Sequence, residues 1–451
     1  MSKAKADPIQ LSDHFSYGRL LRFTLPSVGM MIFTSIYGVV DGYFVSNYAG
    51  KTPFAAVNLI FPLLMILSTA GFMFGTGGSA VVAKAFGQGN PEEANRQFSL
   101  FTYVSFGLGV LLSILGILFI RPISLLLGAE GEMLECTVLY GRIILIALPF
   151  NILQIFFQSF FVTAEKPKLG LLTTVSAGVT NMVLDALLVV LLPQDYKLMG
   201  AAIATGTSQV IGGVLPLFYF SRKNDSLLRL GKAKFCLSPL VKASVNGSSE
   251  LMSNISMNLV GMLYNLQLLK YAGENGVAAY GVMMYVSFIF AATFLGYTMG
   301  TAPIVGFHDG ARNCPELKSL LRKSLIITGL LGISMVAVGE LLTVPLAKLF
   351  VGYDDALMSL TVSGFRIFVL SFPLMGYAIF ASGFFTALND GLTSAVISFL
   401  RTLVFQIAAV LLLPLLWDID GVWVSIIAAE LMAVVFSVLF LILKRKKYGY
   451  F

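Results

Sequence analysis

Apolar and polar positions alternate along this chain on the scale of whole segments. Long apolar stretches recur from residue 20 to residue 443, and the short polar stretches between them hold most of the charges. Each apolar stretch matches or exceeds the roughly 20 residues that a helix needs to cross a bilayer. The pattern predicts an all-α integral membrane protein with twelve transmembrane helices, at residues 20–46, 54–84, 97–120, 133–163, 169–193, 198–221, 238–270, 277–307, 319–347, 357–388, 391–416 and 420–443.

The composition excludes a soluble protein and favours a chain surrounded by membrane lipid. Hydrophobic residues make up 57% of the 451 positions and charged residues 12%, against about 25% charged in soluble domains. The net charge of +7 comes from dispersed basic residues, which membrane topology explains better than nucleic-acid binding. The three cysteines show no CxxC spacing and the two histidines lie at segment ends, so we expect no cofactor, no thiol chemistry and no metal centre of this kind.

Basic residues predict the orientation of the chain. They gather in the N-terminal region, in every second loop and at the C-terminus, whereas the intervening loops carry about one each. By the positive-inside rule both termini are cytoplasmic, which requires an even number of spans. The N-terminal stretch resembles no cleaved signal peptide, so we expect a multi-pass protein of the cell membrane. The terminal basic residues are Lys3, Lys5, Arg19 and Arg22, and Lys444, Arg445, Lys446 and Lys447.

The chain shows an internal repeat. A basic cytoplasmic linker, residues 222–237, separates an N-terminal lobe of six spans (1–221) from a C-terminal lobe of six spans (238–451). Shifting one lobe by 223 positions aligns Tyr48-Ala49-Gly50 with Tyr271-Ala272-Gly273, and a shift of 224 aligns Arg142-Ile143 with Arg366-Ile367. With six spans each, both lobes begin on the same side and form parallel repeats about a pseudo-twofold axis, an architecture of transporters.

The first span contains a carboxylate, Asp41, which is costly in lipid and therefore marks a candidate functional site. In the fifth span, Asn181 and Asp185 lie four residues apart on one helical face. Counted from the predicted outer ends of their helices, Asp41 and Asp185 agree in depth within about 5 Å. The first, fifth and sixth spans therefore bring one oxygen-rich set of side chains to the same level: Tyr37, Asp41, Asn181, Asp185 and Thr205.

This set suits a small hard cation. Two acids in one pocket of low dielectric constant cannot both stay ionised without a counter-charge, which Na⁺ or a proton can supply. If the ion is Na⁺, we expect Asp41, Asn181 and Asp185 to bind the metal. The alternative is a structural ion pair of Asp41, for which Arg142 and Arg366 are the available arginines within spans, although their matching places in the repeat favour a shared structural role.

A second polar stripe lies in the seventh span. Glu250 is near the predicted midplane and is followed at helical spacing by Asn254 and Asn258. Such a stripe can simply hold helices together. The acid favours a cavity that binds substrate or proton, and we assign Gln154 to the same substrate cavity.

Taken together, the residues resemble the multidrug and toxic compound extrusion (MATE) family, particularly its MepA-like branch of bacterial and archaeal drug exporters. The resemblance covers nearly the whole chain and rests on the twelve spans, on Pro26, Tyr37 and Asp41, on GTGGSAVVAKAFGQGNPEEA, and on Asn181 with Asp185. It implies a V-shaped pair of six-helix bundles that export organic cations in exchange for Na⁺ or H⁺. It also implies the N-lobe cation site named above. The tenth span lacks the acid that some relatives have, so a C-lobe cation site of that kind is not implied.

We therefore expect a secondary active antiporter, not an enzyme, that works by alternating access as a monomer. Ion entry would neutralise the two acids, and the first helix would rearrange about a hinge at Pro26. A flippase for lipid-linked saccharides would need several basic groups in its cavity, and an integral membrane enzyme would need a catalytic cluster at one interface. Shifting Asp41 by 223 positions reaches Tyr264, so the coupling ion should belong to the first lobe.

Overall fold

The computed structural model describes residues 9–451, so Lys3 and Lys5 lie outside the described residues. Within this range nearly the whole chain is helical, as a lipid environment requires of backbone polar groups. The elements are α1 (Tyr17–Phe44), η1 (Val45–Ala49), α2 (Lys51–Gly87), α3 (Pro91–Leu126), α4 (Gly131–Thr163), α5 (Pro167–Leu184), η2 (Asp185–Val189), η3 (Gln194–Tyr196), α6 (Lys197–Ser221), α7 (Leu237–Gly310), α8 (Cys314–Val351), α9 (Asp355–Val369), α10 (Phe372–Ala387), α11 (Gly391–Phe399), η4 (Leu400–Val404), α12 (Phe405–Leu412) and α13 (Pro414–Tyr448).

These helices confirm the predicted twelve crossings. Among residues 9–451, ten helices are long and apolar enough to cross a bilayer, or eleven when α9 and α10, which meet at 46°, count as one bent crossing. The helix α7 contains two crossings, because its backbone turns at Gly273 with a φ of 63°, a value that glycine adopts without strain. The bend before α10 was not part of the sequence prediction, although Pro373 restricts the residue before it and explains a break there.

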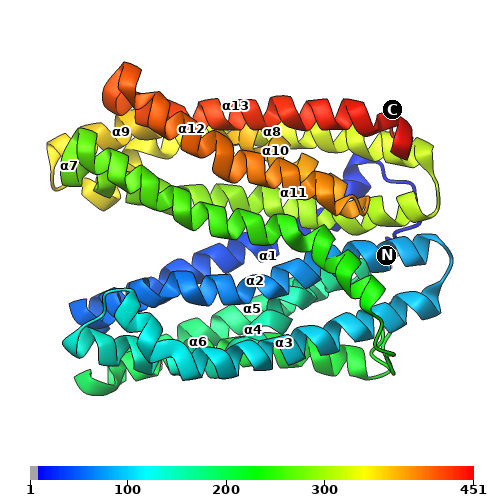
Figure 1. Ribbon diagram of the computed structural model, residues 1–451, viewed down its shortest axis with the longest axis horizontal. Helices are drawn as coiled ribbons and strands as arrows, with labels where there is room; N and C mark the ends of the chain where they lie inside the picture. The colour runs from blue at the N-terminus through cyan, green and yellow to red at the C-terminus, as the bar shows by residue number, and fades with distance from the viewer. Residues whose placement is uncertain (1–8) are drawn as a thin grey trace, which may run out of the picture.

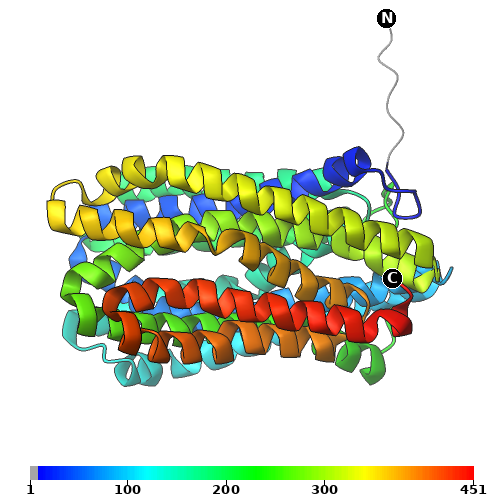
Figure 2. The ribbon, with the colours of Figure 1, turned by 90° about the horizontal axis from the view of Figure 1, so that it is seen from above.

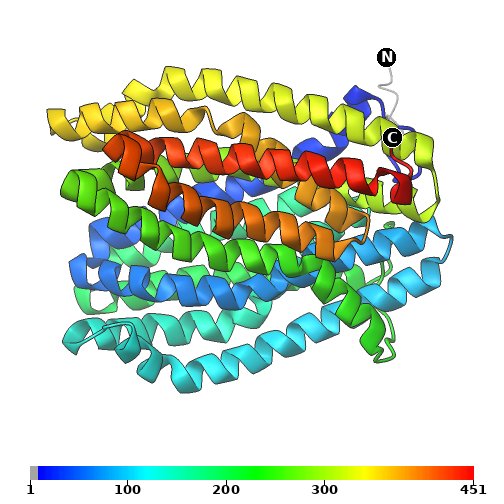
Figure 3. The same ribbon diagram turned by 45° about the horizontal axis from the view of Figure 1, so that its top comes forward.

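The helices form two lobes (Figure 1). In that view most of α1 to α6 lies below and most of α7 to α13 above, and the start of the described chain, in dark blue, lies at the same end of the molecule as the C-terminus (Figures 2 and 3). We call the end that carries both termini the basal end and the opposite end the distal end. The chain passes from one lobe to the other between Ser221, where α6 ends, and Leu237, where α7 begins.

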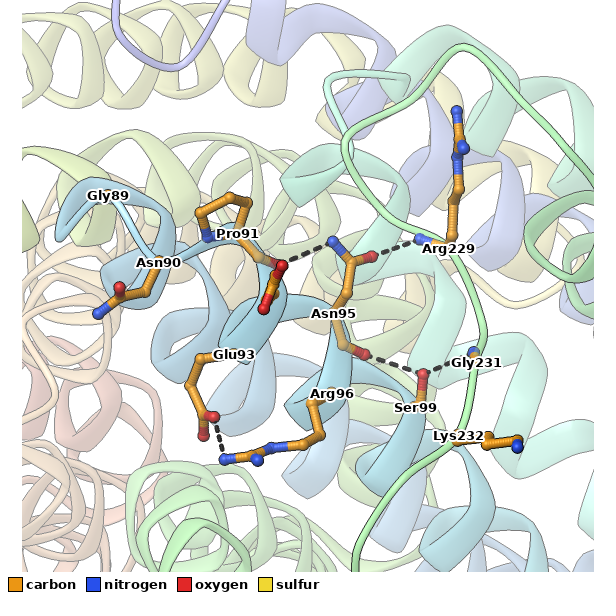
Figure 4. A pocket seen from close by; sticks show the side chains of 11 residues that line it. Gly89, Asn90, Pro91, Glu93, Asn95, Arg96, Ser99, Arg229, Gly231 and Lys232 are labelled. Atoms are coloured by element: carbon orange, nitrogen blue, oxygen red, sulfur yellow. Dashed lines mark hydrogen bonds and ion pairs between the residues drawn. The ribbon is translucent and has the colours of Figure 1, made fainter.

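The linker between the lobes is fixed to the N-terminal lobe. Asn95 and Ser99 lie at helical spacing on α3 and bind the linker backbone (Figure 4). One turn further along α3, the Tyr103 hydroxyl donates to the Gly231 carbonyl. The Asn95 side chain accepts a hydrogen bond from the Arg229 N–H at 2.6 Å, and Ser99 Oγ accepts one from the Gly231 N–H at 3.0 Å. The linker therefore follows α3, and the residues after Gly231 connect to the second lobe.

The lobes touch along a seam of small residues in their basal halves, where α2 and α1 pack on α7. A Cβ atom added at Gly77 would overlap the Ala243 carbonyl, and one added at Gly87 would overlap the Phe307 carbonyl. Glycine is required here because the two backbones approach so closely. An ion pair between Lys84 Nζ and Asp309 Oδ2, at 2.7 Å, joins the lobes at the same level.

Residues 9–16, which we call the N-terminal strap, also cross between the lobes at the basal end. The Leu11 N–H donates to Glu165 Oε1 of the N-terminal lobe at 2.6 Å. The Phe15 N–H donates to Glu316 Oε1 of α8 at 2.9 Å, and the His14 ring pairs with the same carboxylate. Leu11 and Phe15 are completely buried. The strap thus bridges the basal side of the two lobes, and within the described residues all polar contacts between the lobes lie at this end.

Candidate functional site

Three helices of the N-terminal lobe bring the predicted oxygen ligands together. Thr205 of α6 donates its hydroxyl hydrogen to Asp41 Oδ1 of α1 at 3.0 Å. The Asn181 amide of α5 donates in turn to the Thr205 oxygen at 3.5 Å. Asp185, one helical turn beyond Asn181, lies beside Asp41. The structure therefore places Asp41, Asn181, Asp185 and Thr205 in one pocket, which we call the acid pocket.

The acid pocket contains buried oxygen atoms without partners. Within the described residues, neither carboxylate oxygen of Asp185 accepts a hydrogen bond, and the Asn181 side-chain oxygen accepts none either. Asp185 and Asn181 are 0% and 1% exposed. An unpaired buried carboxylate is costly, and it is stabilised by a cation or by protonation. The donor set, carboxylate, amide and hydroxyl oxygen, fits the Na⁺ ion or proton that the sequence predicted.

The backbone changes pitch at the acid pocket. The π-helical turn η2 begins at Asp185, and η1 begins four residues after Asp41. The two turns contact each other, and η2 also packs on α6 near Gly200, where an added Cβ would press on Leu188. Such turns are rare and concentrate at functional sites, because the extra residue redirects the side chains next to it. The sequence contained no pattern that predicted them.

Tyr37, Tyr140 and Gln154 surround the acid pocket. Tyr37 lies close to Asp41 and faces the Gln154 amide, and its ring is 6.2 Å from that of Phe33. Tyr140 of α4 is buried beside both acids and Thr205, and the sequence prediction did not include it. Gln154, which the sequence prediction grouped with Glu250, lies in this N-terminal lobe, where it packs against Gly212.

The polar stripe of α7 behaves differently from the acid pocket. The Asn254 amide donates to the Glu250 backbone carbonyl at 2.8 Å, and the Asn258 amide to the Asn254 carbonyl at 2.9 Å. Both asparagines therefore bind their own helix. The half-buried Glu250 carboxylate forms no hydrogen bond or ion pair with residues 9–451. Of the three polar side chains in the stripe, Glu250 is therefore the one that remains free to bind a ligand.

The sequence indicates Arg142 and Arg366 as the arginines available inside the protein to pair with Asp41, and the structure corrects this. Arg142 is exposed, and Arg366 is 58% exposed and lies 3.6 Å from Glu340, so both occupy lobe surfaces instead of the interior. The interior arginine is Arg401 in η4, which the prediction missed. Its Nε–H donates to both oxygens of Glu430 in α13, at 2.9 and 3.1 Å. The sequence did contain a signal for this ion pair, because each of the last two predicted spans holds one of its two residues.

Tyr264, which the repeat places opposite Asp41, belongs to a closed hydrogen-bond network. Its hydroxyl contacts Gln406 Oε1 and Ser425 Oγ, each at 2.8 Å, and its side chain is 1% exposed. No acid takes part in this network. The C-terminal lobe thus contains neutral hydrogen-bonded groups where the N-terminal lobe contains carboxylates.

Pro26 lies inside the continuous helix α1, next to the seam. Its neighbours Thr24 and Val28 face Gly300 and Gly296 of α7, where added Cβ atoms would crowd α1. A change of the α1 axis at Pro26 would therefore alter the packing between the lobes, because proline interrupts the helical hydrogen bonds.

Two other features do not form the site. A surface pocket of about 690 Å³ lies between α3 and the linker at the basal end (Figure 4). None of the acid-pocket residues lines it. It is lined by residues of both charge signs, Glu92, Glu93, Arg96, Arg229 and Lys232, of which Arg96 and Glu93 form an ion pair. In the part of the chain that the structure describes, no three histidine, cysteine or acidic side chains converge on a metal position.

Known proteins resemble this chain over nearly its full length. The protein named multidrug export protein MepA of Staphylococcus saprophyticus is 23% identical over 432 residues, which cover 95% of this chain and 94% of that protein. Its namesake in Staphylococcus haemolyticus is 24% identical, covering 91% and 90%. A solved structure described as an outward-facing conformation of a multidrug resistance MATE family transporter superposes with a TM-score of 0.92 at 22% identity, covering 99% of each chain.

The family model MatE matches the chain twice, over residues 26–187 and 251–412. The two matches begin almost the same distance apart as the shifts that align the two lobes, which agrees with the predicted duplication. Because they cover more than half of the sequence, the chain belongs to the MatE family, the multidrug and toxic compound extrusion transporters.

Proposed function

We propose that this protein is a secondary active antiporter that exports organic cations in exchange for Na⁺ or H⁺ across the cell membrane. The observation that carries the proposal is the Asp185 carboxylate, which is completely buried beside Asp41 without a hydrogen-bond partner among the described residues. A buried ionisable group in a membrane span typically belongs to an ion or proton pathway. The multidrug export relatives support the substrate class.

The mechanism follows from the arrangement of the helices. The lobes touch at the basal end, the predicted cytoplasmic side, so an ion would reach the acid pocket from the distal, outer side. Its charge would neutralise Asp41 and Asp185 and draw α1, α5 and α6 together. Because Pro26 lies beside the seam, a change in α1 there would loosen the basal contacts and alter the space available to the substrate.

The energetics restrict the stoichiometry. One charge that crosses about 100 mV is worth about 2.3 kcal/mol, or roughly fifty-fold accumulation. An exchange of one monovalent organic cation for one H⁺ or Na⁺ moves no net charge, so the membrane potential would not contribute. A drug cation exported against the potential therefore favours coupling to more than one ion.

The test is uptake of a fluorescent organic cation into proteoliposomes, with a Na⁺ gradient or a pH gradient imposed separately. We expect one gradient to drive uptake, and we expect Asp41→Asn and Asp185→Asn to abolish the driven component. Tyr264→Phe is the matched control, since it removes one hydroxyl at the equivalent place in the second lobe. Full gradient-driven uptake by both aspartate variants would falsify the coupling site.

The flippase alternative has less support. It requires several free basic groups inside the cavity to bind a pyrophosphate. Among the described residues Arg401 is the interior arginine, and Glu430 already neutralises it.

A further inference from the structure

The ion pair of Arg401 and Glu430 is incomplete in its hydrogen bonding. A guanidinium has five N–H groups in a planar fork and can bind a carboxylate through two nitrogens. Here only the Nε–H of Arg401 is used, and both Glu430 oxygens accept from it. The hydrogens on its two terminal nitrogens find no acceptor in residues 9–451. The Arg401 and Glu430 side chains are 16% and 4% exposed, so the ion pair is largely buried, while the unused terminal nitrogens of Arg401 face the accessible space beside it.

The position of Arg401 brings its side chain near Glu250. The start of α11 packs on α7, where a Cβ added at Gly391 would crowd Asn246. From that contact Arg401 is about 15 Å along its helix and Glu250 about 6 Å along α7, in the same direction. Long helical side chains point back toward the helix N-terminus, so the Arg401 side chain descends toward the level of Glu250. The two segments are in contact, and the field of Arg401 acts on Glu250.

The charges of the three groups do not cancel. Two carboxylates and one guanidinium carry one net negative charge, and the Glu250 carboxylate lacks a partner among the described residues. In the C-terminal lobe, a monovalent cation at Glu250 would therefore complete the charge balance. When no such cation is present, the free donors of Arg401 are the nearest source of positive charge.

We propose that Glu250, Arg401 and Glu430 form a substrate site for a monovalent organic cation, and that Arg401 competes with this cation for Glu250. In the loaded state the cation binds Glu250 and Arg401 stays on Glu430. In the emptied state Arg401 bridges the two carboxylates. The inference rests on the proposed function and adds a means of release, because lobe closure that moves Arg401 toward Glu250 expels the substrate. A ligand shifts such an equilibrium only through its different affinity for the two states.

The experiment measures ethidium binding by fluorescence anisotropy with the full-length protein in detergent, at one pH and one Na⁺ concentration. Glu250→Gln should weaken binding about tenfold or more, because the counter-charge is lost. Arg401→Gln alone leaves Glu430 buried without a partner and can fail to fold. The decisive variant is therefore Arg401→Gln combined with Glu430→Gln, which removes both charges and keeps Glu250.

We expect the double variant to bind ethidium about fivefold more tightly or better, while its transport turnover falls by a similar factor. The gain in affinity should vanish when Glu250→Gln is added, and Arg401→Lys should keep near-native affinity. Unchanged or weaker binding by the folded double variant overturns the competition, and unchanged binding by Glu250→Gln overturns the site.

The proposed function fails separately, in the proteoliposome assay. If gradient-driven uptake of ethidium by the native protein persists while Glu250→Gln binds normally, the antiporter assignment stands and the substrate site does not. If the native protein shows no gradient-driven uptake, the function itself is wrong.

Discussion

Asp41 in the first lobe and Tyr264 in the second stand 223 positions apart and occupy equivalent places of the repeat. Around Tyr264 the hydroxyl finds two partners at 2.8 Å, and both partners are neutral side chains. Around Asp41 there is a second acid, Asp185, whose oxygens have no partner in the described residues. Equivalent positions of the repeat therefore differ: the polar group in the C-terminal lobe has its hydrogen-bond partners, whereas the acids in the N-terminal lobe lack a counter-charge among the described residues. The difference supports the proposal that the first site binds a cation, whereas the second holds helices together through neutral hydrogen bonds.

The largest effect should follow from placing an acid in the neutral network. Tyr264→Asp removes two hydrogen bonds and buries a carboxylate without a counter-charge, so we expect a loss of about 3–5 kcal/mol of stability. Thermal unfolding in detergent measures it. Tyr264→Phe is the control and should cost about 1–2 kcal/mol, since only the hydroxyl is lost. A Tyr264→Asp protein as stable as the native one would contradict the contrast between the two lobes.

A smaller effect is expected at the seam of small residues between the lobes. Gly77→Ala adds a Cβ that overlaps the Ala243 carbonyl, so contact between the lobes should weaken by about 1–3 kcal/mol. Distances between spin labels on the basal ends should lengthen, and transport should fall. Gly261→Ala has no neighbour within 4 Å of the added atom and should leave both unchanged. Equal behaviour of the two variants would show that the seam does not govern the lobe positions.

Removing the unpaired acid should stabilise the ion-free protein. Asp185→Asn replaces a buried carboxylate that lacks a partner by a neutral amide, and we expect a gain of about 1–2 kcal/mol in Na⁺-free buffer at neutral pH. Ions that bind the folded state raise stability, so the native protein should gain from Na⁺ or from lower pH while the variant should not. Melting curves in Na⁺ and K⁺ buffers measure this. If ions stabilise both proteins equally, the acid pocket is not the binding site.

The smallest effect on stability is expected at Asp390, an acid that has both hydrogen-bond donors and positive charges around it. Burial raises the pKa of Asp390, but hydrogen bonds from Tyr448 and Thr393 lower it more. The charges of Lys444 and Lys447 act in the same direction, so its pKa lies below the ordinary value of 3.8.

Because the pKa of Asp390 is lower in the folded state, its contribution to stability is present above the ordinary value and is lost as the pH falls through the folded value. We expect this contribution to be below about 1 kcal/mol, because Lys444 and Lys447, the charges that face Asp390, are 33% and 59% exposed and solvent screens them. Melting temperatures recorded between about pH 5 and pH 3 for the native protein and Asp390→Asn measure it. The native protein should lose stability relative to Asp390→Asn as the pH falls. If it gains stability relative to the variant instead, the predicted sign is wrong.

Helical periodicity and depth were enough to predict the fold and most of the acid pocket. Asn181 and Asp185 share a face because they are four residues apart, and Thr205 reaches Asp41 because both lie near the distal ends of their helices. These relations depend only on rise and turn per residue. Tyr140 could not be found in this way, because a tyrosine in an apolar span carries no sign of the direction in which it points.

Arg401 and Glu430 were missed for a different reason. The repeat drew attention to Arg142 and Arg366, which occupy matching positions yet lie on exposed surfaces. The pairing of Arg401 with Glu430 joins two spans whose relative rotation the sequence does not specify. The π-helical turns are equally invisible, because one extra residue per turn leaves no mark in an apolar stretch.

The N-terminal strap has a practical consequence for how the protein is handled. Its residue Leu11 is bonded to one lobe and its residue Phe15 to the other, so the strap resists separation of the basal ends. A modification that displaced the strap would remove these two contacts between the lobes. A label on the linker, which binds α3 and makes none of these contacts, would leave the bridge intact. Labels for distance or transport measurements are therefore best placed away from the strap.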